Sequence, residues 1–219
     1  MTTFEIQTTG GLFIAAALML WLGSILLPAK LGDYFEPADF AAVNRQRRLW
    51  IWIYRLYLFG YVVALMAFIA LATLAADADG RILIWPAVGV LGAGLIMTAL
   101  AYAFYYHFGA WGALDMEGKD EATIREFIAS LRVSTEYVTC LVRFGRVFVG
   151  VGQMVLMVGL LLPGGLWPTW LVGIGGLLGL AGMGVTMAQP DDLRLYRPVF
   201  HLNALWLATM GVVTLTLGP

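Results

Sequence analysis

Apolar residues occur along the chain in six long, nearly continuous runs rather than in alternation with polar residues. A helix of about 20 apolar residues crosses the roughly 30 Å of hydrocarbon in a bilayer. Continuous runs favour helices over barrel strands, because barrel strands alternate apolar and polar positions. A helix also satisfies its own backbone groups in lipid. The predicted spans are Leu12–Pro28, Trp50–Ala76, Leu83–His107, Leu141–Leu162, Leu166–Ala188 and Pro198–Gly218.

Short polar or glycine-rich turns separate these runs. Asp77, Asp79 and Gly80 follow the second run, and Pro163-Gly164-Gly165 divides an apolar stretch that would otherwise be too long for one span. The predicted fold is therefore an all-α integral membrane protein. It forms a single transmembrane domain over residues 1–219, built as three helical hairpins.

Composition supports a membrane protein. Hydrophobic residues make up 61% of the chain and charged residues only 12%, whereas soluble domains are nearer half apolar and a quarter charged. A water-soluble protein of 219 residues could not bury so much apolar surface. Cys140 is the one cysteine, which excludes an intrachain disulfide and a multi-thiolate metal site.

The basic residues fall almost entirely on one side of the predicted topology. Of the 13 Lys and Arg residues, only Arg81 lies in a connection on the other side. The positive-inside rule then predicts a multi-pass protein of the inner cell membrane, with cytoplasmic basic connections and both termini periplasmic or extracellular. Because these charges are membrane-proximal, they favour anionic lipid headgroups as partners and argue against nucleic acid.

The longest connection, residues 109–140, has helical periodicity. Ile124, Phe127 and Ile128 lie on one face, Asp120 is placed to cap the start, and the following segment is rich in charge. We expect an amphipathic cytoplasmic helix between the third and fourth spans. It either lies on the inner leaflet or extends the fourth span, and a bend is expected at residues 134–135.

Arginines near the basic side are the first candidates for binding a solute or a lipid. Arg55, Arg143 and Arg146 lie at or just inside the ends of their apolar runs. Such residues bind headgroups or a phosphorylated solute, or they only orient the protein and reach toward water. A charge inside a span needs a partner. The candidate carboxylates are Glu136, Asp191 and Asp192.

Polar residues deeper in the spans are the second set of candidates. Gln153 and Asn203 are either hydrogen-bonding links between helices or ligands of a solute. Tyr61 and Tyr102 lie deeper than an interfacial aromatic belt requires. No Asp, Glu or Lys occupies the centre of a span, which weakens proton-coupled transport.

His107 and His201 both map near the basic side. They could hold a b-type haem, or share a metal with Asp115 or Glu117, but two histidines without a ligand-spacing motif are also ordinary at an interface. No cofactor is therefore predicted. In the glycine-rich fifth span, the pair Gly175 and Gly179 at small-xxx-small spacing predicts close helix packing, within the chain, with another protein or between copies.

The chain contains no P-loop, no H-E-x-x-H and no G-x-S-x-G motif. The favoured function is a non-enzymatic accessory, scaffold or lipid-interacting component of a membrane system. One alternative is a small transporter or channel for a neutral or anionic solute. A second alternative is a redox protein that binds haem or metal through its two histidines.

Overall fold

The computed structural model describes residues 2–27, 37–163, 166–190 and 192–217, and every regular element in these ranges is a helix. Six helices are long and apolar enough to cross a membrane, which confirms that part of the prediction. They are α1 (Thr3–Leu26), α3 (Arg47–Leu74), a composite third helix, α7 (Arg132–Leu161), α8 (Thr169–Ala188) and α9 (Leu193–Thr216). The composite helix joins α4 (Arg81–Phe104), the π-helix η1 (Tyr105–Trp111) and α5 (Gly112–Asp115).

Local capping sets several helix ends. Helix α1 begins at Thr3 rather than at Leu12, because Thr2 and Glu5 form a reciprocal capping box before the apolar run starts. A short helix, α2 (Pro37–Arg45), precedes α3. Helix α6 (Glu121–Ser130) is capped by Asp120, whose carboxylate accepts from the Thr123 N–H at 2.7 Å.

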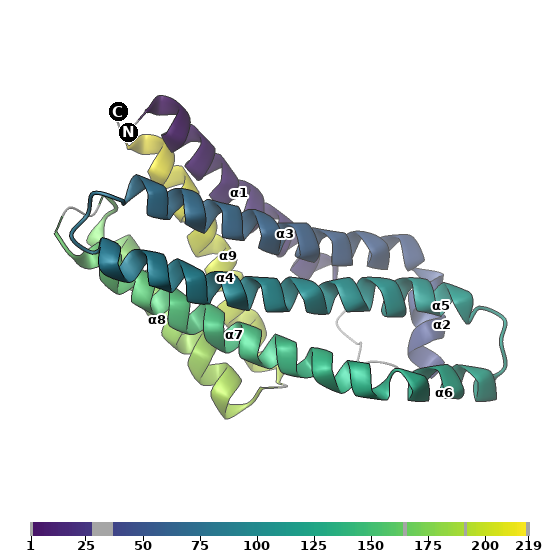
Figure 1. The fold of residues 1–219 in the computed structure, drawn as a ribbon. Coiled ribbons are helices and arrows are strands. Elements are labelled where there is room, and N and C mark those ends of the chain that lie inside the picture. Colours follow the sequence, from purple (N-terminus) through teal and green to yellow (C-terminus); the bar gives the residue numbers. More distant parts are fainter. Residues whose placement is uncertain (1, 28–36, 164–165, 191, 218–219) are drawn as a thin grey trace.

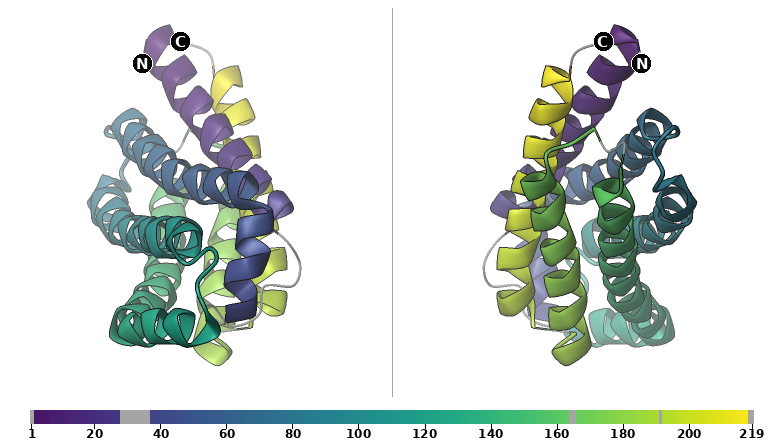
Figure 2. Two further views of the ribbon diagram at one scale, coloured as in Figure 1. Left: turned by 90° about the vertical axis from the view of Figure 1, so that its right-hand side faces the viewer. Right: turned by 90° about the vertical axis from the view of Figure 1, so that its left-hand side faces the viewer.

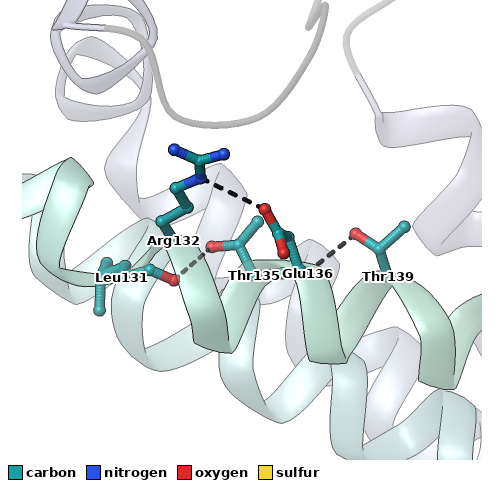
Figure 3. A network of polar contacts seen from close by, with 5 residues as sticks. All are labelled: Leu131, Arg132, Thr135, Glu136 and Thr139. Carbon is teal, nitrogen blue, oxygen red and sulfur yellow. Dashed lines mark hydrogen bonds and ion pairs between the residues drawn. The ribbon is translucent and has the colours of Figure 1, made fainter.

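The bend predicted at residues 134–135 is wrong in position, because α7 runs without a break from Arg132. The break lies at Leu131, between α6 and α7. Past this break the Thr135 hydroxyl donates to the Leu131 carbonyl, and an Arg132–Glu136 pair lies along the same helix (Figure 3). These side-chain contacts continue the helix rather than interrupt it.

The six long helices contact one another in a closed circuit that follows chain order. Helix α1 packs on α3, α3 on α4, α4 on α7, α7 on α8 and α8 on α9, and α9 returns to α1. Figures 1 and 2 show α1 and α9 side by side, inclined to α3, α4 and α7. Because each helix lies beside its chain neighbour, short connections are sufficient.

Glycines bring some of these helices into backbone contact. A Cβ at Gly94 of α4 would lie 2.5 Å from the Gly145 carbonyl oxygen of α7, and one at Gly150 would lie 2.6 Å from the Gly179 oxygen of α8. Gly175 lies against the Trp206 ring of α9. The glycine pair of the fifth span is therefore engaged in packing within the chain.

Aromatic side chains fill the space inside the circuit. The Phe68 ring of α3 lies 5.2 Å from the Phe13 ring and 6.4 Å from the Trp206 ring. The indole N–H of Trp206 donates to the Leu171 carbonyl at 2.9 Å. This pairing satisfies a buried polar group without placing a charge in the core.

The two ends of the bundle differ. At one end Gly10 of α1 lies against Gly211 of α9, and the α3–α4 turn contacts the α7–α8 connection through the Asp79 N–H and the Pro163 carbonyl. We call the opposite end, which carries α2, α5, α6 and the α8–α9 connection, the basic end (Figure 1).

Three helices project at the basic end. Helix α3 has 28 residues, the composite third helix 35 and α7 30. At 1.5 Å per residue they are about 42 to 52 Å long, against roughly 30 Å of hydrocarbon. Since these helices meet near residues 79, 80, 159 and 163 at the other end, the excess length lies at the basic end.

Candidate functional site

Three arginines from three different helices lie at the basic end: Arg55 of α3, Arg146 of α7 and Arg197 of α9. We call this set the arginine belt. Their hydrogen-bond acceptors are neutral oxygens, namely the Tyr106 hydroxyl for Arg55 (3.0 Å), the Pro190 carbonyl for Arg146 (3.2 Å) and the Ser24 carbonyl for Arg197 (3.1 Å).

Contacts between helices place the belt at one level. The Tyr57 ring of α3 lies 3.4 Å from the Cβ position of Gly23 in α1, and the next residue, Ser24, accepts from Arg197. The Phe200 ring of α9 lies 6.0 Å from the same Tyr57 ring. Arg55 is two residues before Tyr57, so it lies within one turn of the level of Arg197.

The ion pairs in the described ranges involve other arginines: Arg47 with Glu117, Arg125 with Glu121 and Arg132 with Glu136. The carboxylates expected to partner the span arginines are engaged elsewhere, since Glu136 pairs with Arg132 and Asp192 accepts from backbone N–H groups at the start of α9. Asp191 lies outside the described residues. Among the described residues, no carboxylate therefore forms an ion pair with an arginine of the belt.

Arg55 belongs to the outward face of α3. Its guanidinium carbon lies 5.5 Å from the Trp52 ring centroid and 5.6 Å from the Tyr106 ring centroid, within cation–π range. The outward face continues with exposed apolar side chains at alternating spacings of three and four residues, beginning with Phe59 and Val62. Arg55 thus lies where aromatic side chains give way to the apolar part of this face.

Arg146 faces inward instead. Its guanidinium carbon lies 4.1 Å from the Tyr196 ring centroid of α9, and its side chain is half-buried. Tyr61 stacks with Tyr102 at a ring separation of 5.7 Å, and Tyr57 stacks with Tyr102 at 4.4 Å. The structure therefore brings together two predicted candidates, Tyr61 and Tyr102, whereas Arg146 contacts Tyr196 of α9.

Gln153 and Asn203 are joined directly. The Gln153 amide nitrogen donates to the Asn203 side-chain oxygen at 2.9 Å and to the Gly175 carbonyl at 2.8 Å. Gln153 is buried, so these bonds link α7, α8 and α9 at a site shielded from water. This geometry is that of a link between helices rather than that of an open ligand site. Arg143, one turn before Arg146, is half-buried on α7.

The two histidines have no contact in common. His201 Nε2 lies 3.3 Å from the Ser24 hydroxyl, and its ring lies beside Phe200. His107 is exposed on the π-helix η1, beside Phe108. Among the described residues, the two imidazoles therefore have different neighbours.

Sequence reasoning missed two features of this region. The π-helix η1 places Tyr106 beside Arg55, and π-helical turns are rare and frequent at functional sites. Tyr196 and Ser24 were not predicted as partners of the belt. The spacing of Trp52, Arg55 and Phe59 at i, i+3 and i+7 was a readable signal for the outward cluster.

Comparison of the chain with protein-family models, with curated proteins and with solved structures finds no match.

Proposed function

We propose that this chain is a non-enzymatic, multi-pass component of the inner membrane that binds anionic lipid headgroups at its basic end. The observation that carries the proposal is the outward cluster of Arg55, Trp52 and Tyr106. A charged side chain on a lipid-facing surface requires a partner or water, and the acceptor that the structure supplies to Arg55 is a neutral hydroxyl.

The chemistry of the guanidinium supports a phosphate as the missing partner. Its planar array of N–H donors fits phosphate oxygens in a bidentate manner, and Tyr106 uses only part of that array. Trp52 is 58% exposed beside it, as expected of an aromatic side chain at headgroup level. Phe59, one turn farther into the apolar face, would lie among acyl chains.

The proposal includes the topology that the charge distribution favours. The basic end faces the cytoplasm, the six spans pair as three hairpins, and α6 is an amphipathic helix on the cytoplasmic side. This orientation directs the arginine belt toward the leaflet face where anionic lipids attract basic residues. Thiol labelling tests it, because a cysteine introduced at Asp79 should react from outside and one at Asp120 only after permeabilisation.

Lipid-dependent stability tests the binding proposal. In nanodiscs, replacing phosphatidylcholine with phosphatidylglycerol should raise the Tm of the wild-type protein. Arg55→Gln should lose most of this increase, since charge-assisted hydrogen bonds contribute about 1.5–3 kcal/mol, a tenfold or larger change in affinity. Arg125→Gln is the matched control, because Arg125 is exposed on α6 and paired with Glu121. Equal lipid responses in both variants would refute a headgroup site at Arg55.

One observation favours a second function, transport of a small anionic solute. Arg146 is half-buried and lies against the Tyr196 ring of α9. Under this alternative, Arg146→Gln should reduce uptake of inorganic phosphate into proteoliposomes, and Arg125→Gln should leave uptake unchanged. Absence of protein-dependent phosphate uptake would count against it.

A further inference from the structure

The outward face of α7 carries an uninterrupted heptad stripe. Eight uncharged residues recur at alternating spacings of four and three over most of the helix, namely Val133, Tyr137, Cys140, Phe144, Val147, Val151, Met154 and Val158. This is the spacing of the apolar seam of a coiled coil. We call it the α7 stripe.

Within the described residues, the first half of the α7 stripe is largely uncovered, whereas Val147, Val151 and Met154 in the second half are half-buried. Val133, Tyr137 and Phe144 are 80%, 65% and 58% exposed. The buried positions of α7, such as Gly145 and Gly150, instead contact α4 and α8. The stripe is therefore a separate face, in addition to the two that build the helical circuit.

The first half of the stripe extends past α8 and α9 and has α4 beside it. Arg146 donates to the Pro190 carbonyl in the α8–α9 connection, so residues 132–145 of α7 lie beyond that connection. At 1.5 Å per residue this segment is about 20 Å long. Apolar residues that leave the hydrocarbon are favourable only where something covers them, whereas lipid alone is sufficient for the second half.

A groove lies alongside the projecting half of the stripe, between α4 and α7. It has a volume of about 470 Å³ and an almost wholly apolar lining, with Leu100 and Phe104 on one side and Val138 and Leu141 on the other. Val133 and Tyr137 belong both to the stripe and to the wall of the groove. A ridge and a groove on the same face are what a self-complementary, isologous contact requires.

We propose that a second copy of this chain covers the α7 stripe, with the two α7 helices parallel about a two-fold axis along the bundle. Two copies inserted in the same orientation can only meet in parallel. In that arrangement each stripe residue meets its own counterpart, and since no stripe residue is charged, no like charges face each other. The groove of each copy then opens beside this contact, because Val133 and Tyr137 belong to both the stripe and the groove wall.

The exposed area is sufficient for such a dimer. Aromatic side chains bury 150–250 Å² each, so Tyr137 and Phe144 at their observed exposures contribute roughly 250 Å². With the remaining stripe residues and Leu100, which is 56% exposed, the area is on the order of 600 Å² per copy. A total of about 1,200 Å² reaches the lower limit of a standard-size specific interface.

Cys140 makes the proposal testable in the unmodified protein. It is the sole cysteine, it is exposed, and it occupies an inner position of the stripe. In a parallel dimer the two Cys140 thiols face each other across the axis. Copper phenanthroline with dissolved oxygen, applied to proteoliposomes at high lipid-to-protein ratio, should convert them to a disulfide-linked dimer that a thiol reductant reverses. If the wild-type protein stays monomeric on non-reducing gels, or forms an adduct of another mass in native membranes, the proposal is wrong.

A matched pair of variants separates a specific contact from random collision. In a Cys140→Ser background, Phe144→Cys places a thiol on the stripe and Phe59→Cys places one on the outward face of α3. The two phenylalanines are similarly exposed, at 58% and 56%. We expect the Phe144→Cys protein to cross-link at least several-fold more than the Phe59→Cys protein. Equal yields would overturn the α7 interface.

Discussion

Helices α4 and α7 approach each other closely at Gly94. A Cβ at this position would lie 2.5 Å from the Gly145 carbonyl oxygen, 2.7 Å from the Val149 nitrogen and 3.0 Å from the Phe148 Cβ. The first two atoms belong to the backbone, so no rotation of a side chain can relieve the contact. Gly94→Ala therefore forces the two helices apart.

The magnitude follows from two opposing effects. Replacing a helical glycine with alanine favours the helix by about 0.5–1 kcal/mol. Overpacking a tight interior site typically costs about 1–3 kcal/mol, and unyielding backbone neighbours place Gly94 at the upper end of that range. We expect Gly94→Ala to destabilise the protein by about 2 kcal/mol net.

Gly89 provides the control on the same helix, because a Cβ there meets nothing within 4 Å. Gly89→Ala should leave stability unchanged or raise it by up to about 1 kcal/mol. Unfolding in mixed micelles by titration with dodecyl sulfate, followed by tryptophan fluorescence, measures both variants against wild type. If the two alanine variants unfold within about 0.5 kcal/mol of each other, the close α4–α7 approach is wrong.

Two further predictions concern polar contacts. Gln153→Leu should destabilise the fold by about 1–3 kcal/mol in the same titration, because it removes the side-chain donor to the Asn203 oxygen and the Gly175 carbonyl. The double variant with Asn203→Leu should recover part of that loss. Additive losses of stability in the double variant would contradict the Gln153–Asn203 link. The backbone N–H of Thr123 holds the pKa of Asp120 below its ordinary value. The resulting helix stabilisation is present above the unfolded pKa of about 3.9 and is lost as the pH falls through the lower folded value. Backbone chemical shifts should therefore show the start of α6 loosening below pH 4, and Asp120→Asn should abolish this response while keeping the cap.

Run length and local capping made much of the fold predictable. The six apolar runs indicated the six long helices, and Asp120 with the helical spacing of Ile124, Phe127 and Ile128 indicated α6. Five of the six long helices begin before their predicted spans, as α1 does at the capping box of Thr2 and Glu5. A hydropathy pattern detects the membrane-crossing part of a helix and not its polar extensions.

The partners of the candidate residues were much less predictable. Because a charge inside a span needs a partner, we expected carboxylates to pair with Arg55 and Arg146. The structure instead supplies a tyrosine hydroxyl to Arg55 and a backbone carbonyl to Arg146. Gln153 and Asn203 are 50 residues apart, and only the packing of α7 against α8 and α9 brings them together. Which residues of different helices come into contact depends on the order of the helices around the bundle. The hydrophobic periodicity of each segment does not specify that order.

The most direct test of the central claim is native mass spectrometry of the protein released gently from its own membrane. We expect wild-type protein to retain anionic phospholipid, and Arg55→Gln to lose a bound lipid that Arg125→Gln keeps. Retention of the same lipids by all three proteins, or of zwitterionic lipid alone, would contradict a headgroup site at the basic end.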